Sequence, residues 1–150
     1  MKNILLFITL IGLVCFVNCG SSEEPAPDDP PVDLKQQMID GLSKIWQVNS
    51  VTLDGIDVSD DWVGFTLKFD KSKNYTAKKL SEKSILVWPE NGSYTIPNSS
   101  NPKNILRNDG IQIVLSNVTA SSVKLSFTIS GRSGGRVESL IGDYIFDMKN

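Results

Sequence analysis

The sequence predicts an all-β domain in which about eight or nine antiparallel strands follow one another as a meander and close into a barrel, after one short helix. Apolar and polar residues alternate along several segments, which is the pattern of strands with one buried and one solvated face. Asn-Gly and Asp-Gly pairs separate these segments and supply the positive φ angles of tight hairpin turns. The alternation changes phase near Gly142, which predicts a bulge or bend of the kind that barrel closure requires.

The short helix is expected ahead of the strands, over residues 33–44. Leu34, Met38, Leu42 and Ile45 are spaced so that their side chains share one helical face. Asp33 comes directly before them and can accept hydrogen bonds from the free backbone N–H groups of a first turn. The sequence therefore predicts a helix that Asp33 caps.

Strands are expected along the rest of the chain. The clearest is 122–130, where Val123, Leu125, Phe127 and Ile129 alternate with polar residues. The expected strands are 46–53, 62–70, 74–80, 85–88, 93–96, 104–107, 111–118, 122–130 and 135–148. The expected turns are Asp54-Gly55, 71–74, Asn91-Gly92, Asp109-Gly110 and 133–135. Because the connections are short, consecutive strands are expected to pair antiparallel.

The first 18 residues have the pattern of an export signal. Lys2 supplies a positive start, and residues 4–17 form an apolar stretch that is too short to span a bilayer comfortably. The segment Phe16-Val17-Asn18-Cys19-Gly20 resembles a lipobox, in which a peptidase cuts before a lipidated cysteine. We therefore expect Cys19 to carry acyl chains such as palmitate, which hold the protein firmly on a membrane. The alternative is an ordinary secretory signal with an incidental cysteine.

An acidic, proline-rich tether is expected to follow, so that the chain divides into 1–18 (signal peptide), 19–31 (lipidated cysteine and tether) and 32–150 (barrel domain). Residues 20–31 carry acidic side chains and no Lys or Arg, and in an extended form they reach up to roughly 35 Å. Ser22-Glu23-Glu24 resembles the acidic signal that sends Bacteroidota lipoproteins to the cell surface. We expect an outer-membrane location, on the cell surface or, as the alternative, on the periplasmic face.

The composition excludes several classes of function. The chain has no histidine, and Cys19 is the only cysteine beyond the signal, so sites that need a His base and zinc sites built from His or Cys are excluded. Outside the tether the charges nearly balance, so no nucleic-acid partner is expected. We expect no catalytic residue, no metal and no cofactor. A glycan hydrolase that uses two carboxylates stays as an alternative.

Six segments carry a family resemblance: Trp46-Gln47-Val48, 50–55, Asn74-Tyr75-Thr76, Trp88-Pro89, 92–96 and 135–146. Together they resemble the lipocalin-like domain of Bacteroidota lipoproteins, a group mostly without assigned function. The resemblance covers residues 40–148. It implies a barrel, and by analogy with true lipocalins it implies that Arg136 stacks on the ring of Trp46. Lys44 stands where true lipocalins have a glycine.

Three aromatic residues, Trp62, Trp88 and Tyr94, are the candidates for ligand binding, because flat rings can stack on the apolar faces of a sugar. The alternative for each ring is packing in the core or rim of the barrel.

Two charged segments are weaker candidates. Asp57, Asp60 and Asp61 offer oxygen ligands of the kind that Ca²⁺ prefers, although a solvated loop is the simpler interpretation. Arg132 and Arg136 flank a glycine-rich segment that can hold an anion. Since that segment does not open a helix, a hairpin is the simpler interpretation there.

The leading hypothesis from the sequence is a non-enzymatic binding or accessory module, anchored to the membrane by its lipid, that holds a small apolar molecule or a glycan in or on the barrel. The second is a structural or interaction protein, whose barrel is filled by its own side chains and whose outer surface docks onto an envelope complex. A barrel interior without space, together with exposed apolar residues, would favour the second.

Overall fold

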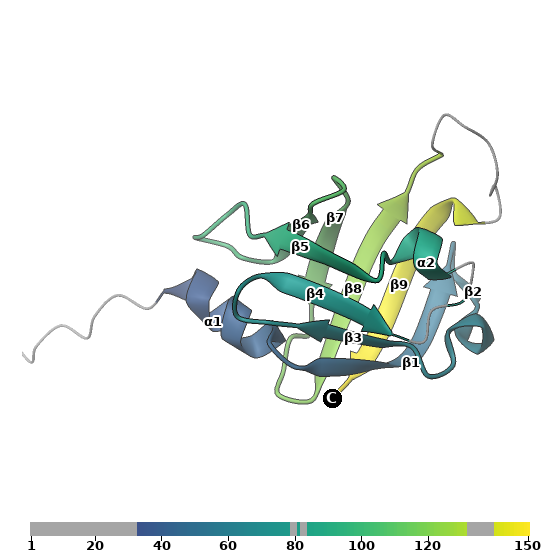
Figure 1. Ribbon diagram of the computed structural model, residues 1–150, viewed down its shortest axis with the longest axis horizontal. Helices are drawn as coiled ribbons and strands as arrows, with labels where there is room; N and C mark the ends of the chain where they lie inside the picture. Colours follow the sequence, from purple (N-terminus) through teal and green to yellow (C-terminus); the bar gives the residue numbers. More distant parts are fainter. Residues whose placement is uncertain (1–32, 79–80, 82–83, 132–139) are drawn as a thin grey trace, which may run out of the picture. The chain divides into compact units, whose positions relative to one another are not determined.

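The computed structural model describes residues 33–78, 81, 84–131 and 140–150 (Figure 1). They belong to one compact unit, Val32–Asn150. Its strands are β1 Ile45–Leu53, β2 Ile56–Asp57, β3 Thr66–Phe69, β4 Asn74–Lys78, β5 Asn91–Thr95, β6 Asn104–Arg107, β7 Gln112–Ser116, β8 Ser122–Ile129 and β9 Gly142–Lys149. Its helices are α1 Leu34–Leu42, the 3₁₀ helix η1 Ser59–Trp62 and the single turn α2 Ser84–Val87. Among the described residues, no helix has the length and apolar content of a membrane-spanning segment.

The strands form one antiparallel sheet that closes on itself. Consecutive strands pair from β3 to β9, β1 pairs with β3, and β9 pairs with β1 to complete an eight-stranded barrel. Among the described strands, the extra strand β2 pairs only with the end of β1. The predicted all-β meander, its closure into a barrel and the short preceding helix are therefore confirmed.

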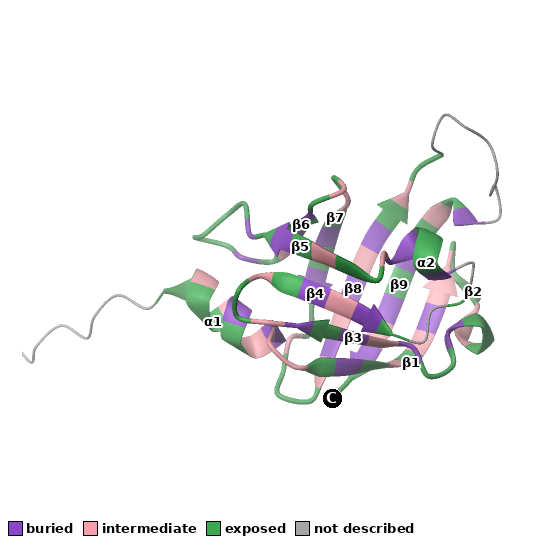
Figure 2. Cartoon of the chain, viewed as in Figure 1, coloured by how far each residue is buried: buried purple, intermediate pink, exposed green. Residues whose placement is uncertain are grey.

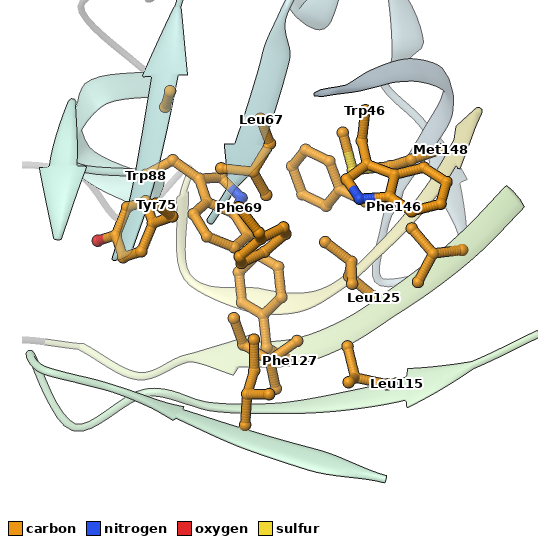
Figure 3. Packing of buried hydrophobic residues seen from close by; sticks show 14 of the residues in the cluster. Trp46, Leu67, Phe69, Tyr75, Trp88, Leu115, Leu125, Phe127, Phe146 and Met148 are labelled. Carbon is orange, nitrogen blue, oxygen red and sulfur yellow. The ribbon is translucent and has the colours of Figure 1, made fainter. Parts of the chain in front are cut away.

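The interior of the barrel is filled by side chains. Buried and solvated residues alternate along the strands, as in β8, where Val123, Leu125 and Phe127 point inward (Figure 2). Figure 3 shows rings and aliphatic side chains from opposite strands meeting in the middle. Edge-to-face pairs of rings dominate, for example Trp88 against Phe127 at 5.5 Å between ring centroids. The buried core of the described residues lies within the compact unit Val32–Asn150, which has the size and the core of a domain that can fold alone.

The barrel has two ends, which we name by their structure. The helix end carries α1, the start of β1, the β3–β4 and β7–β8 turns and the loop 96–103 (Figure 1). The mouth end carries the end of β1, η1, α2, the β6–β7 turn and the start of β9. The antiparallel order of the strands assigns each connection to one end or the other.

At the helix end, α1 packs against the opening of the barrel. Asp33 accepts from the backbone N–H groups of Lys35 at 3.0 Å and of Gln36 at 3.1 Å, which confirms the predicted cap. Leu42 is fully buried, and its carbonyl oxygen accepts a hydrogen bond from Nε1 of Trp46 at 2.9 Å. The helix and the first strand are thereby joined at the base of the core.

Two of the expected strands need correction. Residues 85–88 were expected to be a strand, but α2 forms there because the hydroxyl groups of Ser81 and Ser84 each accept from the other residue's backbone N–H. The expected strand 62–70 shortens to β3, since Trp62 ends η1. The Asp54-Gly55 and Asp109-Gly110 turns are confirmed.

The turn expected at Asn91-Gly92 is wrong, because both residues lie in β5. Gly92 pairs with Tyr75 of β4, and a Cβ atom on Gly92 would overlap the ring and the hydroxyl oxygen of Tyr75. A glycine is therefore needed at this position because the ring of Tyr75 lies against the backbone, and not because a turn requires a positive φ angle.

The irregularity that was predicted near Gly142 takes a different form. The register of the closing β1–β9 pair shifts between Val48 and Ser50, so the irregularity lies on β1 and not on β9. Gly142 has a φ of 147° and begins β9 in register with Ile129. Residues 135–139 of the last expected strand lie outside the described residues.

Candidate functional site

A small pocket lies at the mouth end of the barrel. It has a volume of about 60 Å³ and is lined by Leu53, Val58, Asp61, Trp62, Ser84, Leu140 and Tyr144. Leu53, Val58, Asp61 and Trp62 come from the end of β1 and the β1–β3 connection, Ser84 comes from α2 in the β4–β5 connection, and Leu140 and Tyr144 come from the end of the β8–β9 connection and the start of β9. The site is therefore built by three connections that are far apart in the sequence.

The segment before η1 is held in place by one serine. Ser59 Oγ accepts from the backbone N–H of Val51 at 3.0 Å and donates to Oδ1 of Asp57 at 2.6 Å. Asp57 also accepts from the backbone N–H of Ser59, and these hydrogen bonds hold the pKa of Asp57 below its usual range. This network turns the chain into η1 and directs Trp62 inward. The centroid of the Trp62 ring lies 4.6 Å from that of the Phe146 ring.

Tyr144 forms the opposite wall of the pocket. Its hydroxyl donates to the carbonyl oxygen of Leu140 at 3.3 Å, and its ring stacks on Phe127 at 5.5 Å. Burial raises the pKa of Tyr144 to about 12, with the negative charges of Asp54 and Asp61 adding to the effect. The phenol is therefore neutral near pH 7, and it can donate a hydrogen bond but does not serve as a base there.

A buried arginine lies at the end of β6, and sequence reasoning missed it. Arg107 is 2% exposed, forms an ion pair with Asp109, and donates from Nη1 to the carbonyl oxygen of Val87 at 2.8 Å. Its guanidinium lies over the ring of Trp88, 4.6 Å from the ring centroid. The alternation in β6 gave a signal for it, because Arg107 shares the inward face with Ile105.

Arg107 thus fastens α2 across the mouth end. Val87 and Trp88 are fully buried, and Trp88 contacts Tyr75 at 5.5 Å between ring centroids as well as the aromatic core. Within the described residues, the Tyr75 hydroxyl and Trp88 Nε1 are buried and have no hydrogen-bond partner. Burial raises the pKa of Tyr75, while the nearby charge of Arg107 lowers it.

The three aromatic candidates lie apart and are buried. Trp62 and Trp88 pack at the mouth end, whereas Tyr94 packs against Phe69 at 5.4 Å toward the helix end. Each ring already has aromatic neighbours, as the core interpretation expected, and the rings form no exposed platform for a sugar. Trp62 is the one that lines the pocket.

The charged candidates separate as well. Asp57 is engaged by Ser59, Asp61 lines the pocket, and no group of acidic, cysteine or histidine side chains within the described part of the chain is arranged to hold a metal. Arg132 and Arg136 lie outside the described residues, and so does the predicted stacking of Arg136 on Trp46.

Lys44 is the cation that the structure places over the ring of Trp46. Its Nζ lies 5.6 Å from the ring centroid and donates to the carbonyl oxygen of Ala120 at 2.7 Å. This contact joins the base of the barrel to the β7–β8 turn. Cys19, the predicted lipidation site, lies outside the described residues.

The geometry limits what the pocket can hold. Pockets for drug-sized ligands usually enclose about 300 Å³ or more, whereas this one has room for a few water molecules or one small aliphatic group. No protein-family model, no curated protein and no solved structure matches this chain.

Proposed function

We propose that this chain is an exported lipoprotein, anchored in the outer membrane through Cys19, whose barrel docks onto another component of the cell envelope and does not carry a ligand inside. The filled interior of the barrel is the observation that supports this proposal most directly. The rings of Trp46, Trp88 and Phe146 occupy the space that an internal ligand would need (Figure 3).

Exposed apolar residues at the mouth end also support it. Val63 is 79% exposed, Ile56 is 69% exposed and Leu86 is 58% exposed, and they lie on the connections that surround the pocket. The chain enters the domain at Asp33, at the helix end. An anchor on that side leaves the mouth end directed away from the bilayer and accessible to a partner.

The absence of an internal ligand is tested by mass spectrometry of an organic extract from the purified protein. We expect no compound that accompanies the protein at equimolar amounts. A lipid-like compound at that ratio would contradict the docking proposal and favour a carrier.

The anchor is tested separately by metabolic labelling with palmitate. We expect Cys19→Ala to lose the label and to release the protein from membranes. Cys15→Ala is the matched control and should keep both properties, because Cys15 lies in the apolar part of the signal. Labelling that persists in Cys19→Ala would overturn the lipoprotein assignment.

The side of the membrane is tested by adding protease to intact cells. We propose display on the cell surface, which the acidic Ser22-Glu23-Glu24 supports. The mature protein should then be digested in intact cells, and a protein that is digested only after lysis would place the domain on the periplasmic face.

Binding of a small molecule or glycan at the mouth is the second candidate, since Trp62 lines the pocket and Trp88 Nε1 has no hydrogen-bond partner within the described residues. Titration with monosaccharides, followed by tryptophan fluorescence, tests it. A saturable change that disappears in Trp62→Phe would support this candidate.

A further inference from the structure

The charged residues of the described chain segregate between the two ends of the barrel. The lysines at the helix end are Lys35, Lys44, Lys68, Lys71, Lys73, Lys103, Lys124 and Lys149, with Asp33, Asp40, Asp70 and Asp147 among them. The charged residues at the mouth end are Asp54, Asp57, Asp60, Asp61, Glu90, Asp109 and Asp143, with Lys78 and the buried Arg107. Among the described residues, the helix end therefore carries a net positive charge and the mouth end a net negative charge.

Strand register brings three of these lysines onto one outer surface. Lys68 of β3 lies opposite Ile45 of β1, and Lys149 of β9 lies opposite Gln47, two residues further along β1. Lys124 of β8 follows on the far side of β9. All three alternate with inward-facing neighbours, so they point away from the core.

Some of this positive charge is compensated locally. Asp147 lies directly opposite Lys124, and Oδ1 of Asp40 lies 3.1 Å from Nζ of Lys71. Both Asp40 and Lys71 are exposed, so their ion pair is weak and the two charges stay available to a second partner. Lysines still outnumber carboxylates at this end.

Two exposed apolar residues lie among the lysines. Leu34 is at the start of α1, and Ile45 is between Lys68 and the end of α1. Apolar side chains surrounded by lysines are the composition of surfaces that lie in the headgroup region of a bilayer. The chain also enters the domain here, next to Leu34, on the side where the proposed anchor attaches.

We propose that the helix end docks onto the anionic lipid headgroups of the membrane that anchors the protein, which directs the mouth end outward. This inference rests on the membrane anchoring proposed above. Asp54 and Asp57, at the far end of β1, oppose it little, because β1 is roughly 30 Å long and charges are screened over about 8 Å at physiological ionic strength. Each lysine near such a surface strengthens binding about fivefold.

The test measures the binding of residues 20–150, which lack the lipidated cysteine, to vesicles by co-sedimentation. We expect binding to an equimolar mixture of phosphatidylcholine and phosphatidylglycerol, no binding to phosphatidylcholine alone, and loss of binding as salt is raised. The combined variant Lys68→Gln, Lys124→Gln and Lys149→Gln should bind about a hundredfold more weakly. Lys78→Gln is the matched control, and it should bind as the unaltered protein does, because Lys78 is an exposed strand lysine at the mouth end.

Three results would overturn the inference. The first is failure of the unaltered protein to bind anionic vesicles. The second is binding by residues 32–150 but not by residues 20–150, since the acidic tether would then cover the lysines in place of the membrane. The third is tighter binding to a DNA duplex than to the vesicles. Because the protein tested carries no lipid, none of these results depends on whether Cys19 is acylated.

Discussion

The helix end and the mouth end of the barrel are built on the same eight strands, yet they are closed in different ways. At the helix end, α1 covers the opening, and one hydrogen bond joins Trp46 to Leu42. At the mouth end, two short turns cross the opening and leave a pocket of about 60 Å³. The helix end is rich in lysine and the mouth end is rich in aspartate.

The strands contribute little to this difference, because a continuous set of inward-facing side chains fills the barrel from one end to the other. The connections between the strands produce the difference in how the two ends are closed. An α-helix brings its own hydrogen bonds and an apolar face, so it covers an opening without further help. A single turn such as α2 cannot, and it depends on a partner in the barrel wall.

The variant with the largest expected effect is Arg107→Met, which tests whether α2 depends on its partner in the barrel wall. The variant leaves the carbonyl oxygen of Val87 and the carboxylate of Asp109 without their partner, so we expect the free energy of unfolding to fall by about 3 kcal/mol in urea denaturation. Lys103→Met at the exposed helix end should change it by less than about 0.5 kcal/mol. Similar effects from both variants would mean that α2 does not depend on Arg107.

Gly142→Ala tests the mouth end at the start of β9. Gly142 has a φ of 147°, and an added Cβ would lie 2.5 Å from Oδ2 of Asp54. The Asp54 side chain cannot move freely, because its Oδ1 accepts from the backbone N–H of Asp143 at 2.8 Å. We expect a loss of about 2 kcal/mol in the free energy of unfolding, measured by denaturation. An unchanged midpoint would show that β9 can begin in another conformation.

The sequence was sufficient for features that depend on neighbouring residues. Alternation identified the core strands, and the Asp-Gly pairs located two hairpin turns. The sequence was insufficient for residues 85–88, because a short apolar run fits a strand or a helical turn equally well. The serine hydroxyls that decide between the two precede this run. Arg107 was missed for a related reason, since its partner Val87 is on another connection.

The aromatic candidates show the same limit. A tryptophan or tyrosine between a turn and a strand can stack on a sugar or pack inside, and only the closure of the barrel decides. Trp62, Trp88 and Tyr94 are all buried once β1 pairs with β9. The pocket itself combines three connections, and its lining could not be assembled from any one segment.

High pH tests whether the two ends lose stability together. Burial raises the pKa of Tyr144, at the mouth end, and of Tyr94, toward the helix end, to about 12 from an ordinary value of 10. Because the unfolded phenols ionise first, their stabilising contribution is complete below pH 10 and is lost as the pH rises to about 12. The free energy of unfolding, measured by circular dichroism at a series of pH values, should fall between pH 10 and about 12. Tyr144→Phe and Tyr94→Phe should each make this fall with pH less steep. A slope that only one variant reduces would mean that the ends respond differently.

The smallest expected effect has the opposite sign and belongs to the helix end. Gly41 lies within α1, where its φ is not positive, and an added Cβ would make an ordinary contact of 3.6 Å with Cγ1 of Val118. Alanine also loses less backbone entropy than glycine on forming a helix. We therefore expect Gly41→Ala to raise the free energy of unfolding by up to about 1 kcal/mol in the same denaturation experiment. A gain here beside a loss in Gly142→Ala would show that the helix end tolerates a regular backbone while the mouth end requires a glycine. A loss in both variants would instead mean that α1 is packed as tightly against the β7–β8 turn as β9 is against Asp54.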